Sequence, residues 1–125
     1  RARRCRKMLG GGMRQVGVLA AAGLVALEQM VERLAEDHAN AKRLGEGIAR
    51  LPGLRVDLAR VQTNIVIFFA DRSDGAAMLV RECAARKVKI HQIGPASIRC
   101  VTHKDVDRED IDRALQAFTE ITRDW

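Results

Sequence analysis

The chain has little aromatic character: three phenylalanines, one tryptophan and no tyrosine among 125 residues. Single-stranded nucleic acid is usually bound by aromatic side chains interleaved with basic ones, and this sequence has no such platform. The net charge of +6 does not replace it, because the excess lies in one short stretch before the first acid, Glu28. That stretch carries Arg1, Arg3, Arg4, Arg6, Lys7 and Arg14. We therefore expect no nucleic-acid partner.

Cysteine is scarce, and long apolar runs are absent. Cys5, Cys83 and Cys100 are three in number and far apart, which fits neither a paired disulfide framework nor a close metal-binding pair. We expect a reducing compartment, by default the cytoplasm, with mitochondria left open, and no bound metal. The longest apolar run, residues 16–27, is shorter than the roughly 20 residues that cross a bilayer. It is expected to form a buried helix, and no membrane partner is expected.

Three consecutive glycines, Gly10 to Gly12, interrupt the helix-forming start of the chain. Glycine costs about 1 kcal/mol relative to alanine inside a helix, so this run predicts a sharp break in the backbone. The break has two interpretations, which the glycines alone leave open. It is a flexible connector between helices, or its amides, flanked by Lys7 and Arg14, hold a phosphate or carboxylate at the start of the next helix.

Hydrophobic periodicity predicts an α/β fold of the α+β type. Two helices flank the glycines, and a third carries an apolar stripe, with His38 in it as a packed structural residue, until Pro52 stops it. Predicted strands and helices then follow in the order ββαββα, at residues 54–58, 64–69, 75–86, 88–93, 97–101 and 107–125. The strand at 64–69 is expected to be buried on both faces. We expect a small, largely antiparallel sheet with helices on one face.

Arg99 is the most informative polar residue of the predicted sheet. Alternation along the strand puts Ile98 and Cys100 on one face and Arg99 on the other. A mid-strand arginine either reaches solvent at a sheet edge or offers a bidentate guanidinium to a carboxylate or phosphate. His103 and Asp105 follow closely, but no nucleophile accompanies them, so a turn and helix entry is the better interpretation.

Four blocks of the sequence resemble the C-terminal part of the low-specificity L-threonine aldolases, and together they span nearly the whole chain. They are RKMLGGGMRQ at 6–15, GVLAAAG at 17–23, QTN at 62–64 and IRCVTHKDV at 98–106. Members of that family are fold-type I pyridoxal-phosphate enzymes that cleave threonine and allo-threonine to glycine and acetaldehyde. They assemble as dimers or tetramers with active sites at subunit interfaces. From its activity the resemblance implies an amino-acid substrate, and from its assembly a homo-oligomer.

The resemblance also implies roles for three residues. Arg99 matches the arginine that binds the substrate α-carboxylate. Arg14 and Lys7 match basic residues near the cofactor and its phosphate, serving their own or a neighbouring subunit. Residues 1–30 then correspond to a helical connecting segment from the large cofactor domain, and residues 31–125 to the small C-terminal domain.

The same resemblance implies that the catalytic residues lie elsewhere. In the family, the lysine that forms the Schiff base, the aspartate that pairs with the pyridine nitrogen and the histidine that stacks on the ring all precede this segment. No lysine of this chain occupies the Schiff-base context, so we expect a fragment that is inactive by itself and has no catalytic residue of its own. The alternative is a non-catalytic α/β module that oligomerises or binds an acidic partner through its basic N-terminal arm.

Overall fold

The computed structural model describes all 125 residues and divides them into two compact units, Arg1–Glu32 and Arg33–Trp125, which are described separately. The first unit consists of α1 (Ala2–Met8) and α2 (Gly17–Gln29), with the glycine loop between them. Gly10 has φ +82°, a left-handed conformation that favours glycine, so the predicted break is confirmed. No residue of α2 is buried, in contrast to the expected buried helix. None of the helices has both the length and the apolar character needed to cross a bilayer.

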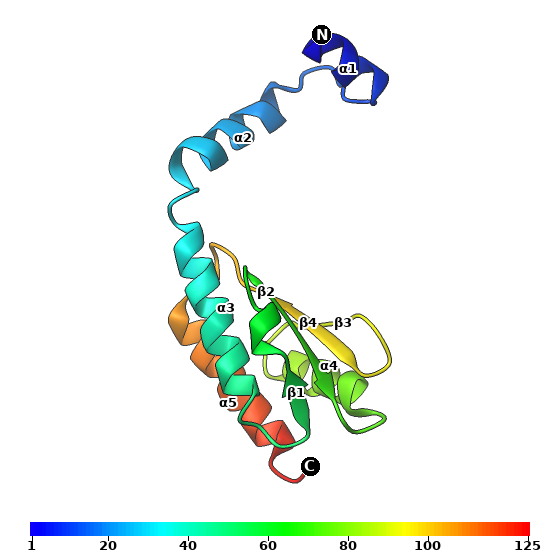
Figure 1. Ribbon diagram of the computed structural model, residues 1–125, viewed down its shortest axis with the longest axis vertical. Helices are drawn as coiled ribbons and strands as arrows, with labels where there is room; N and C mark the ends of the chain where they lie inside the picture. The colour runs from blue at the N-terminus through cyan, green and yellow to red at the C-terminus, as the bar shows by residue number, and fades with distance from the viewer. The chain divides into compact units, whose positions relative to one another are not determined.

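The second unit is an antiparallel sheet with helices on one face, as predicted (Figure 1). The strand order is β1-β2-β4-β3, and every neighbouring pair is antiparallel. Its elements are α3 (Leu34–Ile48), β1 (Leu54–Val56), η1 (Leu58–Arg60), β2 (Ile65–Ala70), α4 (Gly75–Ala85), β3 (His91–Gln92), β4 (Ser97–Val101) and α5 (Arg108–Thr122). The predicted order ββαββα is therefore confirmed for residues 54–125.

The core lies between the sheet and the three helices α3, α4 and α5. Val66 and Phe68 of β2 and Ile98 of β4 are fully buried on the helix-covered face. Phe118 of α5 packs against Phe68 with their ring centroids 5.7 Å apart. Because Phe68 and Ile98 are register partners, this layer fixes the centre of β4 from behind. Burial of these apolar side chains is the main stabilising contribution to the unit.

Two strands, β1 and β3, are shorter than predicted, for identifiable local reasons. Residues 88–90 are not a strand, because the N–H of Val88 donates to the carbonyl of Cys83 (2.9 Å) and closes the end of α4. Lys87 takes the left-handed conformation (φ 63°) that this type of helix end requires. β1 ends at Val56, because the side chain of Asp57 accepts from the N–H of Ala59 (3.1 Å) and starts η1.

Two burial predictions are wrong. β2 is central in the sheet but buried on one face only, and Ile65, Ile67 and Phe69 are about 40% exposed on the other. No helix of this unit covers that outer face. His38 is exposed on α3, whereas Asn40 takes a buried position. The buried side of α3 is partly polar because the Asn40 side chain binds the loop after β4, while the Asp37 carboxylate pairs with Arg33 at the start of the helix.

Candidate functional site

Arg99 lies at the centre of β4 and projects from the outer face of the sheet. Its neighbours Ile98 and Cys100 are buried on the opposite, helix-covered face, as the alternation predicts. Across the sheet, Arg99 is opposite Ile67 of β2 and His91 of β3. The guanidinium forms no hydrogen bond or ion pair within the chain, so its donors are free to bind an anion.

A shallow depression of about 350 Å³ surrounds Arg99. It is lined by Lys89, Ile90, His91, Arg99, Val101 and His103. Four of these residues carry basic side chains and none is acidic. The two cations among them, Lys89 and Arg99, raise the local concentration of anions. The depression can therefore bind a carboxylate or phosphate, with Arg99 as the planar, bidentate donor.

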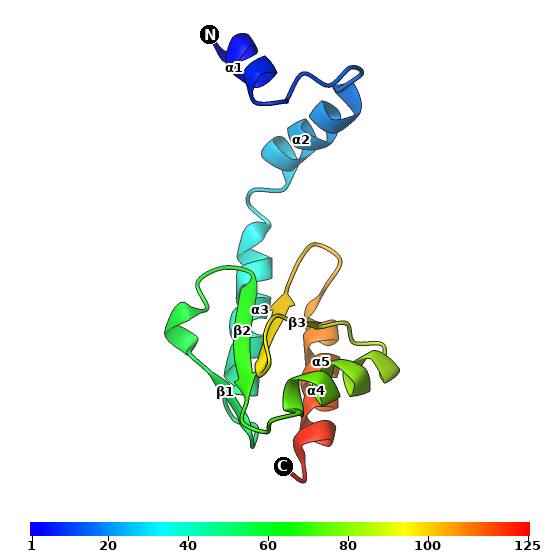
Figure 2. The ribbon, with the colours of Figure 1, turned by 90° about the vertical axis from the view of Figure 1, so that its right-hand side faces the viewer.

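The loop that follows β4 is fixed by hydrogen bonds to two other elements. The two shortest hydrogen bonds between Asn64 and Thr102 run from the Thr102 N–H to the Asn64 carbonyl (2.9 Å) and from the Asn64 Nδ2 to the Thr102 carbonyl (2.8 Å). The buried Thr102 hydroxyl donates to the Asp37 carbonyl of α3 (2.7 Å), and Asn40 Nδ2 donates to the Val106 carbonyl (3.1 Å). This loop connects β4 to α5 at one end of the sheet (Figure 2). The anchors hold the wall of the depression that contains His103.

Sequence reasoning missed part of this network. Asn64 belongs to the block QTN and Thr102 to the block IRCVTHKDV, so the two blocks meet in the hydrogen bonds that hold one loop. Asp37 and Asn40 gave only a weak signal, namely a polar side chain four residues or one residue before the apolar stripe position Ala41. α3 binds the loop through the Asn40 side chain and the Asp37 backbone carbonyl, whereas the Asp37 carboxylate pairs with Arg33.

His103 and Asp105 form a turn, as predicted. The Asp105 N–H donates to His103 Nδ1 (3.3 Å), and the His103 Nδ1 is 3.7 Å from Asp105 Oδ2. The Lys104 ammonium hydrogen-bonds to Asp105 and lowers the pKa of that carboxyl. Asp105 is therefore ionised at neutral pH on the exposed side of the turn. No serine, threonine or cysteine hydroxyl or thiol bonds to His103, so the turn contains no nucleophile–base pair.

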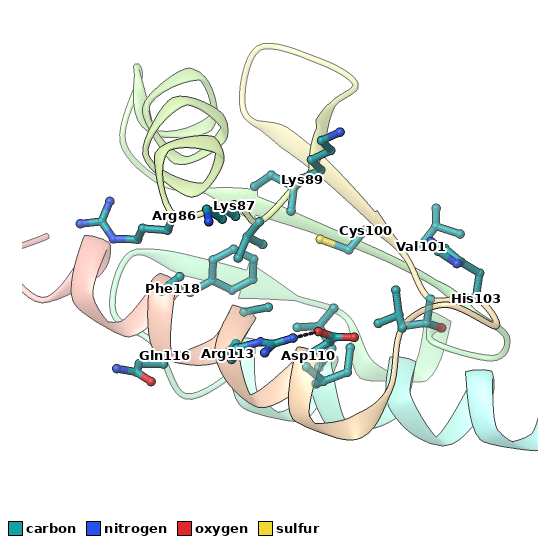
Figure 3. A pocket seen from close by; sticks show the side chains of 18 of the residues that line it. Arg86, Lys87, Lys89, Cys100, Val101, His103, Asp110, Arg113, Gln116 and Phe118 are labelled. Carbon is teal, nitrogen blue, oxygen red and sulfur yellow. Dashed lines mark hydrogen bonds and ion pairs between the residues drawn. The ribbon is translucent and has the colours of Figure 1, made fainter.

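A larger groove of about 700 Å³ lies between residues 86–90, β4 and α5 (Figure 3). Cys100 directs its sulfur into this groove, near the ring of Phe118. Burial raises the pKa of the Cys100 thiol to about 12, which keeps it neutral and a poor nucleophile. On the rim, Arg113 pairs with Asp110 and Arg86 pairs with Glu82 and Glu120, which neutralises most of the charge. No group of three His, Cys, Asp or Glu residues in the chain is arranged to hold a metal ion.

Lys7 and Arg14 belong to the first unit, at the two ends of the glycine loop. Both side chains are exposed and form no ion pair within the chain. A Cβ added at Gly12 would lie 2.8 Å from Cδ of Lys7, and one at Gly11 would lie 2.9 Å from Cγ of Arg6. The glycines therefore leave room for basic side chains to lie against the loop. Two free cations beside a side-chain-free backbone are a donor set that suits a phosphate.

The known proteins most informative for this chain are threonine aldolases. The chain is 37% identical over 124 residues to low-specificity L-threonine aldolase 1 of Arabidopsis thaliana, and the match covers 96% of this chain and 34% of that protein. It is 45% identical over 111 residues to the low specificity L-threonine aldolase of Escherichia coli K12, covering 89% of this chain and 32% of that protein. The chain thus spans about a third of the length of these relatives.

A solved structure supports the fold. A C-DES mutant with glycine covalently linked to its PLP cofactor matches with a TM-score of 0.68 at 23% identity, over 83% of this chain and 28% of that one. At that identity the likeness concerns the fold alone. The beta-eliminating lyase family model matches residues 1–73, which include the glycine loop, α3 and β2. With more than half of its residues matched in this way, the chain belongs to the beta-eliminating lyase family.

Proposed function

We propose that this chain is the C-terminal part of a pyridoxal-phosphate-dependent aldolase that cleaves threonine and allo-threonine to glycine and acetaldehyde. The relatives named as threonine aldolases, at 37% and 45% identity over most of the chain, support this activity. The observation that carries the proposal is the free guanidinium of Arg99 in a basic depression on the open face of the sheet. A binding module with a basic arm would not require that arrangement.

In this proposal, Arg99 binds the α-carboxylate of the amino acid through two parallel N–H donors. The fork fixes the orientation of the substrate as well as its position, so the bond between Cα and Cβ is held at one angle to the reacting groups. The buried neighbours Ile98 and Cys100 hold the strand that carries the fork, and the Asn64–Thr102 pair holds its end. Arg99 therefore acts as a binding and orienting residue.

The glycine loop is proposed to lie against the cofactor. Lys7 and Arg14 would bind its phosphate, in their own subunit or in a neighbouring one, because both are free cations next to a backbone that glycine leaves accessible. When bound, pyridoxal phosphate supplies an electron sink for the electron pair that leaves the Cα–Cβ bond. We expect the 125 residues by themselves to have no aldolase activity, because none of their lysines stands in the family's Schiff-base context. A homo-oligomer, dimer or tetramer, and a cytoplasmic location belong to the same proposal.

The test replaces Arg99 in the full-length protein that carries this chain. Loss of one charge-assisted, bidentate contact removes about 1.5–3 kcal/mol of binding, so Arg99→Ala should raise the KM for threonine about 10- to 100-fold. Arg99→Lys should recover only part of this loss, because an ammonium group cannot form the fork. The absorbance of the bound cofactor should remain, since Arg99 is assigned to the substrate.

Arg55 provides the matched control. It is an exposed arginine on β1, is register partner of the outer-face residue Phe69, and is paired with Asp71. Arg55→Ala should leave the KM for threonine within about two-fold of the original value, because a neutralised arginine at the sheet edge has little to offer an anion. A threonine KM that is unchanged in Arg99→Ala would refute the assignment of the carboxylate site.

A further inference from the structure

Besides Arg99, the depression holds a second cation, Lys89, and two imidazoles, which are more donors than a single carboxylate needs. Lys89, His91 and His103 line it together with Arg99, and no acidic side chain lines it. Lys89 and His91 are exposed and make no ion pair within the chain. Two cations, Arg99 and Lys89, that line one depression with no acidic side chain in its lining favour an anion between them.

The register of the sheet places one of these residues directly beside Arg99. His91 is the partner of Arg99 across the β3–β4 pair, and directly opposite residues share a face with Cβ atoms about 4.5–5.5 Å apart. Both side chains are exposed on the outer face. An anion held by Arg99 therefore has His91 at its side, within reach of a second group on the same ligand.

Lys89 adds a free cation on this side of Arg99. The end of α4 draws residues 88–90 away from the sheet, because the Val88 N–H is used by the Cys83 carbonyl. Ile90 is partly buried in the core, and the exposed Lys89 side chain lines the depression. Lys89 and His91 thus place two basic side chains beside Arg99, on either side of the partly buried Ile90.

We propose that Lys89 and His91 form a second anion subsite, which takes an acidic group on the side chain of the substrate while Arg99 takes its α-carboxylate. This inference rests on the proposed function. The substrate class is then β-hydroxy amino acids that end in a carboxylate or a phosphate, and β-hydroxyaspartate is the simplest probe. Its cleavage breaks the Cα–Cβ bond. The electron pair passes to Cα, which gains a proton and leaves as glycine, while the hydroxyl loses its proton and becomes the aldehyde of glyoxylate.

The experiment uses the full-length holoenzyme and compares kcat/KM for β-hydroxyaspartate with kcat/KM for threonine. The original enzyme should favour β-hydroxyaspartate. Lys89→Met and His91→Asn should each lower the ratio of the two constants about 10-fold, because methionine has no donor and the shorter asparagine withdraws its donor from the second acid group. Lys89→Arg should restore most of the ratio. Lys42→Met, at an exposed lysine of α3 outside the depression, is the control and should leave the ratio unchanged.

Binding without turnover provides a second readout. Succinate, a dicarboxylate without an amino group, should bind the holoenzyme in calorimetry more tightly than acetate, and Lys89→Met should weaken succinate about 10-fold while leaving acetate nearly unaffected. If the cluster instead holds the cofactor phosphate, Lys89→Met and His91→Asn would lose cofactor absorbance on dialysis and reduce both substrates equally, which would overturn the subsite.

The outcomes separate this inference from the function on which it rests. An unchanged substrate ratio in Lys89→Met and His91→Asn, together with a raised KM in Arg99→Ala, would reject the second subsite and retain the aldolase. An Arg99→Ala variant with unchanged KM for both substrates would reject the proposed function itself.

Discussion

Phe118 offers the most direct test of the packing that holds the Arg99 strand in place. Its side chain is fully buried, and its ring lies 5.7 Å from that of Phe68, the register partner of Ile98. Phe118→Ala should lower the free energy of unfolding by about 3–5 kcal/mol, from lost apolar transfer and an unfilled cavity. Contact between the two rings accounts for about 0.5–1.5 kcal/mol of this loss.

Phe118→Leu keeps the measurement possible if the alanine variant does not fold. Leucine retains most of the apolar volume but removes the ring contact, so the loss should be about 1–2 kcal/mol. Gln116→Ala is the control, since this exposed side chain of the same helix bonds only to Glu120 and its loss should cost at most about 0.5 kcal/mol.

Trp125 makes the assay specific to the second unit. It is the one tryptophan of the sequence, and a Cβ added at Gly53 would lie 2.9 Å from its ring. Its fluorescence should therefore change when the unit unfolds in urea, and the midpoint and slope give the free energy of unfolding. A loss below about 1 kcal/mol for Phe118→Ala, with an unchanged slope, would show that Phe118 does not support the layer behind β4.

Two further predictions concern close packing and ionisation. A Cβ at Gly47 would lie 2.4 Å from Cδ2 of Leu115, so Gly47→Ala should destabilise the unit by about 1–2 kcal/mol in the same urea assay. Burial raises the pKa of the Cys83 and Cys100 thiols from 9.0 to about 12, so an alkylating reagent at pH 8.5 should modify only the exposed third cysteine of the folded chain. As pH rises, the two thiols ionise in the unfolded chain before they ionise in the folded one, so the free energy of unfolding should fall between pH 9 and 12. Rapid modification of all three thiols at pH 8.5 would contradict the burial.

The predicted elements rested on local patterns, and those that depend only on neighbouring residues were correct. Alternation at 97–101 is sufficient to place Arg99 opposite to Ile98, because successive side chains of a strand point to opposite faces. The acidic start of α5 is likewise local: Asp107 and Asp110 form a capping box, in which each side chain accepts from the other's backbone N–H. No distant residue is needed for either result.

The errors arose where a local group had a distant or competing partner. Residues 88–90 have strand-like composition, but the N–H of Val88 completes the end of α4 instead of a sheet ladder. β2 has the composition of a strand buried on both faces, yet the side chains of Ile67 and Phe69 are about 40% exposed, because composition does not tell which layers cover a sheet. Asn40 was overlooked because its partner, the Val106 carbonyl, lies 66 residues away.

By itself the sequence determined the helices, the strands, their order, the face on which Arg99 stands and, through four blocks, the family resemblance. Only the tertiary structure decided what surrounds Arg99. His91 and Lys89 are adjacent to it because β3 pairs with β4 in one particular register, and His103 because hydrogen bonds to Asn64 fix the loop. Side-chain direction follows from the covalent geometry of a strand, whereas the register of a pair is set by the packing and hydrogen bonding of the whole unit.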